Sequence, residues 1–208
     1  MGIPTIERLH PIFETVVAFN PKTHEMFDLF AEPEKYQALL KDYADEIRGY
    51  SLSRVFLSIR QPYKLTFFKH VAEYLSEEDF AEYLIECYTG CEVTSDTTNV
   101  SKQELIDFFT KADKQYLMDK EDLEVFNSLP DKVTIYRGVR DKAGVYELSW
   151  TLSLEKARWF ANRFSSLGYV FKTVVNKADI LCYISCRGEQ EVVIDARQLK
   201  KYTIEEIA

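Results

Sequence analysis

Two carboxylates stand two residues apart near the end of the chain, in the stretch RGEQEVVID at residues 187–195. Glu189 and Glu191 are separated by Gln190, and three apolar residues follow at once. In an extended segment, residues two apart lie on the same side, with their Cα atoms roughly 6–7 Å apart. Two acids placed in this way can deprotonate a substrate or stabilise a developing positive charge. The alternative is ordinary surface charge before a core strand.

A cation and a row of hydroxyls precede the acids. Arg137 ends the strand-like run VTIYRG, and Gly138 after it would allow a ligand close to the backbone. Ser149, Thr151 and Ser153 occupy alternate positions, so on a strand their hydroxyls would face one side. One cation, one hydroxyl row and one acid pair suit a reaction that has an anionic substrate and a cationic transition state.

The elements that must position these groups follow from the spacing of apolar residues. Three stretches of the first 130 residues have the three- and four-residue spacing of amphipathic helices: 33–50, 67–88 and 101–119. Ser101 and Glu104 have the spacing of a capping box at the start of the last of these stretches. Breaks are expected at Pro21, Pro33 and Pro62.

The period changes after the Pro130-Asp131 turn. Extended segments are predicted at 133–136, 147–153, 169–175, 180–185 and 191–195. Between them, Ser153 is expected to cap a helix at 154–164 with an apolar stripe of Ala157, Phe160, Ala161 and Phe164. Trp159 and Phe160 are expected in the core. The sequence thus predicts an α+β protein with helices in residues 1–130 and strands in residues 131–208, joined as one compact unit.

Charge is distributed unevenly along the chain. The net charge is −8, but residues 133–208 hold 12 Lys or Arg and 9 Asp or Glu, whereas residues 1–132 hold 14 and 25. The acidic part argues against general nucleic-acid binding, which needs a basic face. No apolar run approaches the length of a membrane span, and no secretory signal is recognisable, so we expect a cytoplasmic protein.

Several common chemistries are disfavoured. The seven glycines are too widely spaced for a Gly-rich nucleotide-binding loop, and the three histidines all lie in the first 130 residues. A four-thiolate zinc site is conceivable, but one of the two cysteine pairs lies in a strand-like run, so free thiols and no metal are expected. The four cysteines are Cys87, Cys91, Cys182 and Cys186.

The order of the motifs resembles the ADP-ribosyltransferases of the cholera-toxin-like branch, whose signature is Arg, then Ser-Thr-Ser, then Glu-x-Glu. Arg137 matches the arginine, and Glu189-Gln190-Glu191 matches Glu-x-Glu. Ser149-Trp150-Thr151 stands where Ser-Thr-Ser is expected, and it departs from that motif in its second and third residues. The resemblance covers about residues 130–196.

The resemblance implies a split β-sandwich that binds NAD as a substrate and uses no metal. Arg137 would contact the pyrophosphate or adjoining ribose, with Gly138 and Thr151 nearby, and Ser149 would hold Glu191. Glu191 would bind the ribose and stabilise the oxocarbenium-like charge as nicotinamide leaves. Glu189 would orient or deprotonate a protein acceptor, most often arginine in Glu-x-Glu members. The aromatic residues that could pack on nicotinamide are Phe164, Tyr169 and Phe171.

This interpretation makes the chain a mono-ADP-ribosyltransferase, of the kind used by bacterial or phage effectors on intracellular proteins. An NAD glycohydrolase would share the site but use water as acceptor. A non-catalytic interaction module on the same fold is a second alternative. A glycoside hydrolase is a remote third, because its two acids usually come from separate strands.

Overall fold

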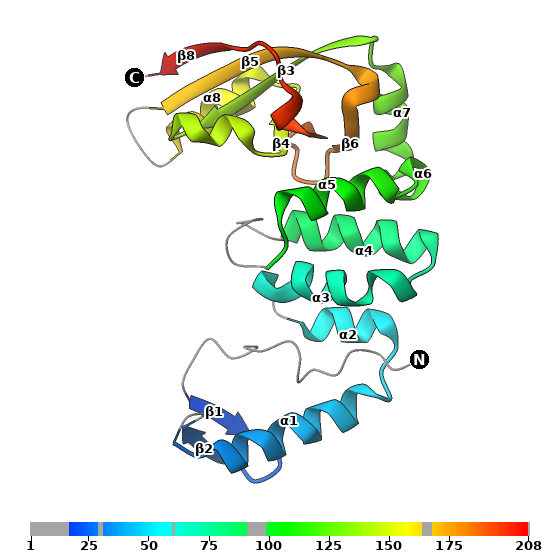
Figure 1. Cartoon of the computed structure of the whole chain (residues 1–208), viewed down its shortest axis with the longest axis vertical. Helices are drawn as coiled ribbons and strands as arrows, with labels where there is room; N and C mark the ends of the chain where they lie inside the picture. Colours follow the sequence, from blue (N-terminus) through cyan, green and yellow to red (C-terminus); the bar gives the residue numbers. More distant parts are fainter. Residues whose placement is uncertain (1–16, 29–30, 60, 91–98, 164–167, 208) are drawn as a thin grey trace. The chain divides into compact units, whose positions relative to one another are not determined.

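The computed structural model describes residues 17–28, 31–59, 61–90, 99–163 and 168–207, and shows a mixed α+β protein (Figure 1). Contacts between residues divide the chain into two compact units. Unit 1 comprises residues 1–76 and 83–100, and unit 2 comprises residues 77–82 and 101–208. The change of period at residue 130 is a change from helix to strand inside unit 2.

Unit 1 contains a hairpin followed by a helix. Strands β1 (Val17–Asn20) and β2 (Glu25–Asp28) pair antiparallel, and His24 has a positive φ in the turn between them. Helix α1 (Pro33–Ile47) begins at a proline, which costs no hydrogen bond in the first turn. Apolar side chains of the hairpin and the helix form one cluster: Ala18, Phe27, Tyr36, Leu39 and Leu40. The spacing of apolar residues predicts α1 but not the hairpin.

The remaining helices of unit 1 pack around aromatic side chains. They are α2 (Leu52–Ser58), η2 (Gln61–Tyr63), α3 (Lys64–Val71), η3 (Ala72–Tyr74) and the part of α4 (Glu77–Gly90) from residue 83 on. The rings of Phe56 and Tyr83 stack with centroids 3.9 Å apart. The buried Lys64 is paired with Glu86 at 2.5 Å. A buried ammonium needs such a partner, because its desolvation is otherwise uncompensated.

Three short helices open the main part of unit 2: α5 (Lys102–Lys111), α6 (Lys114–Leu117) and α7 (Lys120–Ser128). Ser101 and Glu104 form the capping box that their spacing predicts. The aspartates Asp113 and Asp119 cap the next two helices. Side-chain acceptors thus satisfy main-chain donors at all three helix starts.

The sheet of unit 2 has the order β6-β7-β4-β3-β5-β8, and every pair is antiparallel. Its strands are β3 (Lys132–Val139), β4 (Ser149–Thr151), β5 (Gly168–Asn176), β6 (Ile180–Ile184), β7 (Glu191–Ile194) and β8 (Thr203–Ile207). Short 3₁₀ turns lie between strands: η4 (Lys142–Tyr146), η5 (Lys177–Asp179) and η6 (Ala196–Gln198). The first five strands fall within or around segments that the alternation of residues predicts; β8 was not predicted.

Helix α8 (Leu154–Asn162) lies against β3 and β5 (Figure 1). Ser153 caps it, as predicted. A Cβ added to Gly138 would lie 1.7 Å from the carbonyl oxygen of Ala157. The space above Gly138 is therefore filled by the helix backbone, and this glycine permits close packing where the sequence suggested the approach of a ligand.

The stripe predicted for this helix is only partly buried. Ala157 and Ala161 are buried, Phe160 is half-buried, and Trp159 is 54% exposed. The expectation that Trp159 belongs to the core is wrong, because its position lies on the helix side away from the two alanines. Phe164 lies outside the described residues.

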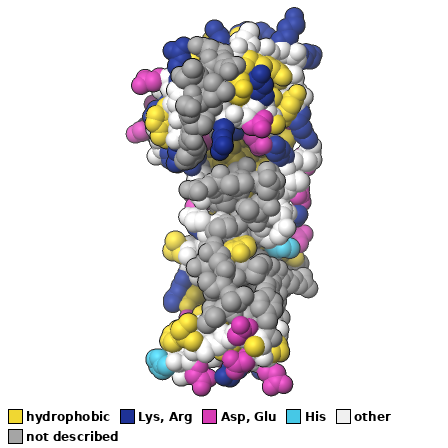
Figure 2. Space-filling view, turned by 90° about the vertical axis from the view of Figure 1, so that its left-hand side faces the viewer, with side chains coloured by type: hydrophobic (Ala, Val, Ile, Leu, Met, Phe, Trp, Pro, Cys, Tyr) yellow, Lys and Arg dark blue, Asp and Glu magenta, His cyan; other side chains and the backbone are white. Residues whose placement is uncertain are grey.

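The charge asymmetry of the sequence is visible on the surface. In Figure 2, Asp and Glu side chains gather over the hairpin and α1 of unit 1, whereas the surface of unit 2 in this view carries many Lys and Arg side chains. Among the described residues, no helix combines the length and apolar character needed to cross a bilayer.

Candidate functional site

Glu189 and Glu191 lie on the connection between β6 and β7, which we call the acid loop (residues 185–191). A turn opens the loop, in which the Gly188 N–H donates to the carbonyl of Ser185 at 2.6 Å. Gly188 has φ +65° and Gln190 has φ +49°. A positive φ is ordinary for glycine but costs energy at glutamine. The strained residue therefore lies directly between the two acids.

The two acids differ in exposure. Glu191, the first residue of β7, is 2% exposed, and it stands opposite Thr151 on β4 and Ile184 on β6. The side chain of Glu189 is 23% exposed. The first acid of the motif can thus be reached from outside, whereas the second is held within the sheet.

A guanidinium joins the two carboxylates. Arg187 Nη2 lies 3.4 Å from an oxygen of Glu189 and 3.4 Å from an oxygen of Glu191. Our sequence interpretation did not include Arg187. Its position, two and four residues before the acids, is the signal that could have identified it, because a cation this close in the sequence can reach both carboxylates.

Thr151 and its neighbour hold the far end of the acid loop. The Thr151 hydroxyl donates to the carbonyl of Glu189 at 2.6 Å, and Leu152 N–H donates to the carbonyl of Gln190 at 3.0 Å. Ser149 stands opposite Val193, two residues further along β7 than Glu191. The register therefore places the hydroxyl of Thr151, and not that of Ser149, beside the acid loop.

Arg137 contacts main-chain oxygens on the other side of the site. Its Nε donates to the carbonyl of Gly144 at 2.6 Å, and its Nη1 donates to the carbonyl of Ser149. Tyr136, its neighbour on β3, is the residue that pairs with Thr151. Adjacent residues of a strand point to opposite faces. Arg137 therefore projects from the face opposite to Thr151, and its two main-chain contacts link β3 to η4 and β4.

Two of the three aromatic residues proposed for the nicotinamide, Tyr169 and Phe171, also project from the Arg137 face. Phe171 stands opposite Arg137, is 1% exposed, and packs edge-on against Tyr202 with ring centroids 5.4 Å apart. The ring of Tyr169 has the ammonium of Lys142 at 4.7 Å. Phe171 is a core residue, and Tyr169 is the more accessible of the two.

Acidic neighbours surround the two cysteines of this region. Burial, followed by the charges of Asp122 and Glu191, raises the pKa of the Cys182 thiol above its ordinary value of 9.0. Burial also raises the pKa of Cys186, against the opposing effect of Arg187. Neither of these thiols forms a disulfide, and nor does that of the buried Cys87. Among the described residues, no group of three or more His, Cys, Asp and Glu is arranged to hold a metal ion.

The raised pKa of Cys182 predicts a loss of stability in alkali. The unfolded thiol ionises near its ordinary pKa while the folded thiol stays neutral, so folding is favoured below about pH 9 and weakened as the pH rises beyond it. We expect the free energy of unfolding to fall by up to about 1.4 kcal/mol per pH unit above this point. Urea denaturation of the wild type, of Cys182→Ala and of Cys186→Ala, which removes a more exposed thiol whose pKa is also raised, tests this. The decrease of the unfolding free energy with rising pH should be smallest in Cys182→Ala. An equal decrease in all three chains would contradict the prediction.

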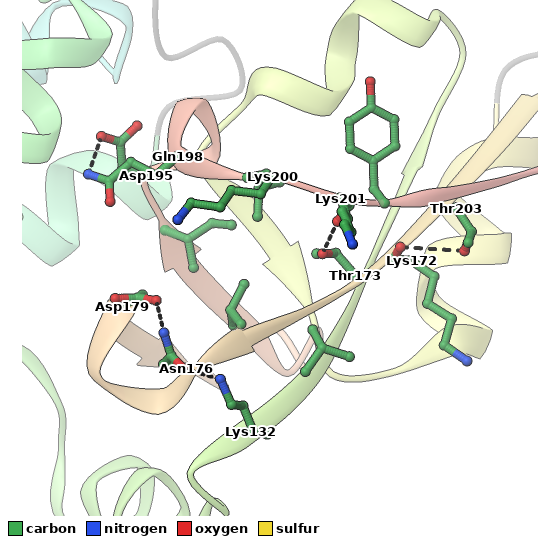
Figure 3. A pocket seen from close by; sticks show the side chains of 15 residues that line it. Lys132, Lys172, Thr173, Asn176, Asp179, Asp195, Gln198, Lys200, Lys201 and Thr203 are labelled. Atoms are coloured by element: carbon green, nitrogen blue, oxygen red, sulfur yellow. Dashed lines mark hydrogen bonds between the residues drawn. The ribbon is translucent and has the colours of Figure 1, made fainter.

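An open hollow elsewhere in unit 2 has a different character (Figure 3). It lies between β5 and the segment that joins β7 to β8, and its lysines are Lys132, Lys172, Lys200 and Lys201. Both acids of its lining have partners: Asp195 accepts from Arg197 at 2.8 Å, and Asp179 accepts from Asn176 at 2.7 Å. None of the described residues that we predicted from the sequence to take part in catalysis or NAD binding lines this hollow. The acid loop is therefore the better candidate for chemistry.

Comparison with known proteins identifies no relative: no family model, no curated protein and no solved structure matches the chain. The motifs and the geometry of unit 2 are therefore the basis for a proposed function.

Proposed function

We propose that the chain is a mono-ADP-ribosyltransferase that moves ADP-ribose from NAD to an arginine side chain of a protein and releases nicotinamide. The observation that carries the proposal is the acid pair with its guanidinium. Glu189 and Glu191 each lie 3.4 Å from the same nitrogen of Arg187. A site whose two carboxylates already bind one guanidinium has the chemistry needed to bind another, that of an acceptor arginine.

The two acids would divide the reaction between them. Glu191 would bind the ribose hydroxyl and stabilise positive charge as the bond between ribose and nicotinamide breaks, with the electron pair leaving on nicotinamide. A nitrogen of the acceptor guanidinium would then form the new bond to the ribose and give up a proton, for which the more exposed Glu189 is the available base. The burial of Glu191 suits the first role, because a fixed charge needs no reorganisation during the reaction.

Arg137 and the hydroxyl row would support these steps less directly. Arg137 binds the carbonyls of Gly144 and Ser149, which connects η4 to β4. Thr151 holds the carbonyl of Glu189. We assign to these residues the positioning of β4 and the acid loop. Contact of Arg137 with the pyrophosphate stays a prediction from the resemblance.

Incubation with NAD labelled in its adenylate part tests the proposal, with a cell lysate and agmatine as alternative sources of a guanidinium. We expect label on protein or agmatine from the wild type, together with free nicotinamide. Free ADP-ribose without any labelled acceptor would favour the NAD glycohydrolase. If no NAD is consumed, the catalytic proposal fails and the interaction module becomes the better explanation.

A further inference from the structure

Asp122 on α7 is buried beside the first residue of the acid loop. It is 6% exposed, and its Oδ2 accepts a hydrogen bond from the Ser185 N–H at 3.1 Å. Its Oδ1 is buried without a hydrogen-bond partner among the described residues. A buried carboxylate oxygen without a partner is costly, so some other benefit must account for this side chain.

The bond to Asp122 fixes the end of the acid loop that Thr151 does not reach. Ser185 is held on both sides, by Asp122 at its N–H and by the Gly188 N–H at its carbonyl. At the other end, Thr151 and Leu152 hold the carbonyls of Glu189 and Gln190. The loop is thus fixed from a helix at its start and from the sheet at its end.

We propose that Asp122 is the positioning residue of the acid loop: its hydrogen bond to Ser185 holds the loop so that Glu189 and Glu191 stay in place. The anchoring is a property of the fold, and its consequence for catalysis rests on the proposed function. The position of α7 supports this role, since Asp119 caps the helix and accepts from the Asp122 N–H at 2.8 Å. The main chain that carries Asp122 is therefore fixed as well.

Asp122 lies near the same buried thiol as Glu191, because both carboxyl groups raise the pKa of Cys182. Its side chain provides an oxygen acceptor for the Ser185 N–H. The amide of asparagine could provide the same acceptor without the charge.

Two substitutions separate the hydrogen bond from the charge. Asp122→Asn keeps an acceptor oxygen, whereas Asp122→Leu keeps the branched arrangement of heavy atoms, is larger and has no acceptor. Ser101→Ala is the matched control, because it removes the side-chain cap of α5 and lowers stability without touching the loop. Amide hydrogen exchange over residues 185–189, with β3 and β5 as internal references, reports anchoring directly and needs no activity.

We expect exchange of the loop amides to rise about tenfold or more in Asp122→Leu and to stay near wild type in Asp122→Asn and Ser101→Ala, with β3 and β5 unchanged in all three chains. In NAD cleavage, kcat should fall by about 100-fold in Asp122→Leu, because a small misplacement of catalytic groups has effects of this size. The KM for NAD should change much less, and Asp122→Asn should restore most of kcat.

If the Ser185 amide of the wild type exchanges hydrogen as fast as an unprotected amide, the proposal is wrong whatever the variants show. Loop exchange in Asp122→Leu that is no faster than in Ser101→Ala would overturn it too. If the wild type cleaves no NAD, the proposed function fails, and the exchange data still decide whether Asp122 anchors the loop.

Discussion

Replacing Glu191 with glutamine should lower the rate of nicotinamide release from NAD by about 100- to 1000-fold, the range seen when one preorganised charge-stabilising group is removed. The change keeps the size of the side chain and removes its charge. Since Glu191 is 2% exposed and begins β7, water cannot readily take its place. The loss should appear mainly in kcat, because the charge is needed most when the ribose becomes cationic.

Two further variants make this expectation specific. Glu189→Gln should preserve most nicotinamide release and lower transfer to the guanidinium acceptor, because this acid is assigned to the acceptor step. Glu155→Gln, at an exposed position in the first turn of α8, should leave both rates unchanged. Thermal melts should show all three chains folded. A Glu191→Gln chain that releases nicotinamide at the wild-type rate contradicts the assignment.

The strands β3 to β7 of unit 2 and their order in the chain could be predicted because their signal is local. Alternation of β-branched and polar residues predicts β3, and the capping box predicts the start of α5. The β1–β2 hairpin and β8 carry weaker alternation, and β8 also depends on pairing with β5, a strand distant in the sequence, so residue spacing did not predict them.

The motifs of the candidate site were recognised from their order, but their contacts depend on register. Thr151 stands opposite Glu191 and Ser149 opposite Val193, and a shift of two residues would have exchanged these roles. Asp122 joins the site from a helix, more than sixty residues before Ser185 in the sequence. No spacing rule relates two such positions, so only the folded chain could identify this residue.

Gly138→Ala should destabilise the fold by about 3 kcal/mol, the upper part of the usual range for overpacking. The added Cβ would lie 1.7 Å from the Ala157 carbonyl oxygen and 2.8 Å from the Ala161 nitrogen. These are backbone atoms of α8, which cannot turn aside as a flexible side chain can. The helix would have to move away from β3, and the contacts between them would loosen together.

The same substitution at two other glycines gives the controls. At Gly188, where φ is +65° and a Cβ would meet no atom within 4 Å, alanine should cost only about 1 kcal/mol, from backbone conformation. At Gly49 the nearest atom is 3.7 Å away, so alanine should be nearly neutral. The urea midpoints of the three variants rank their losses of stability, since the slope m of the unfolding free energy against urea concentration should stay constant. If Gly138 instead served the approach of NAD, Gly138→Ala would match Gly49→Ala in stability and lose only NAD affinity. That pattern would restore the ligand role that the closeness of α8 argues against.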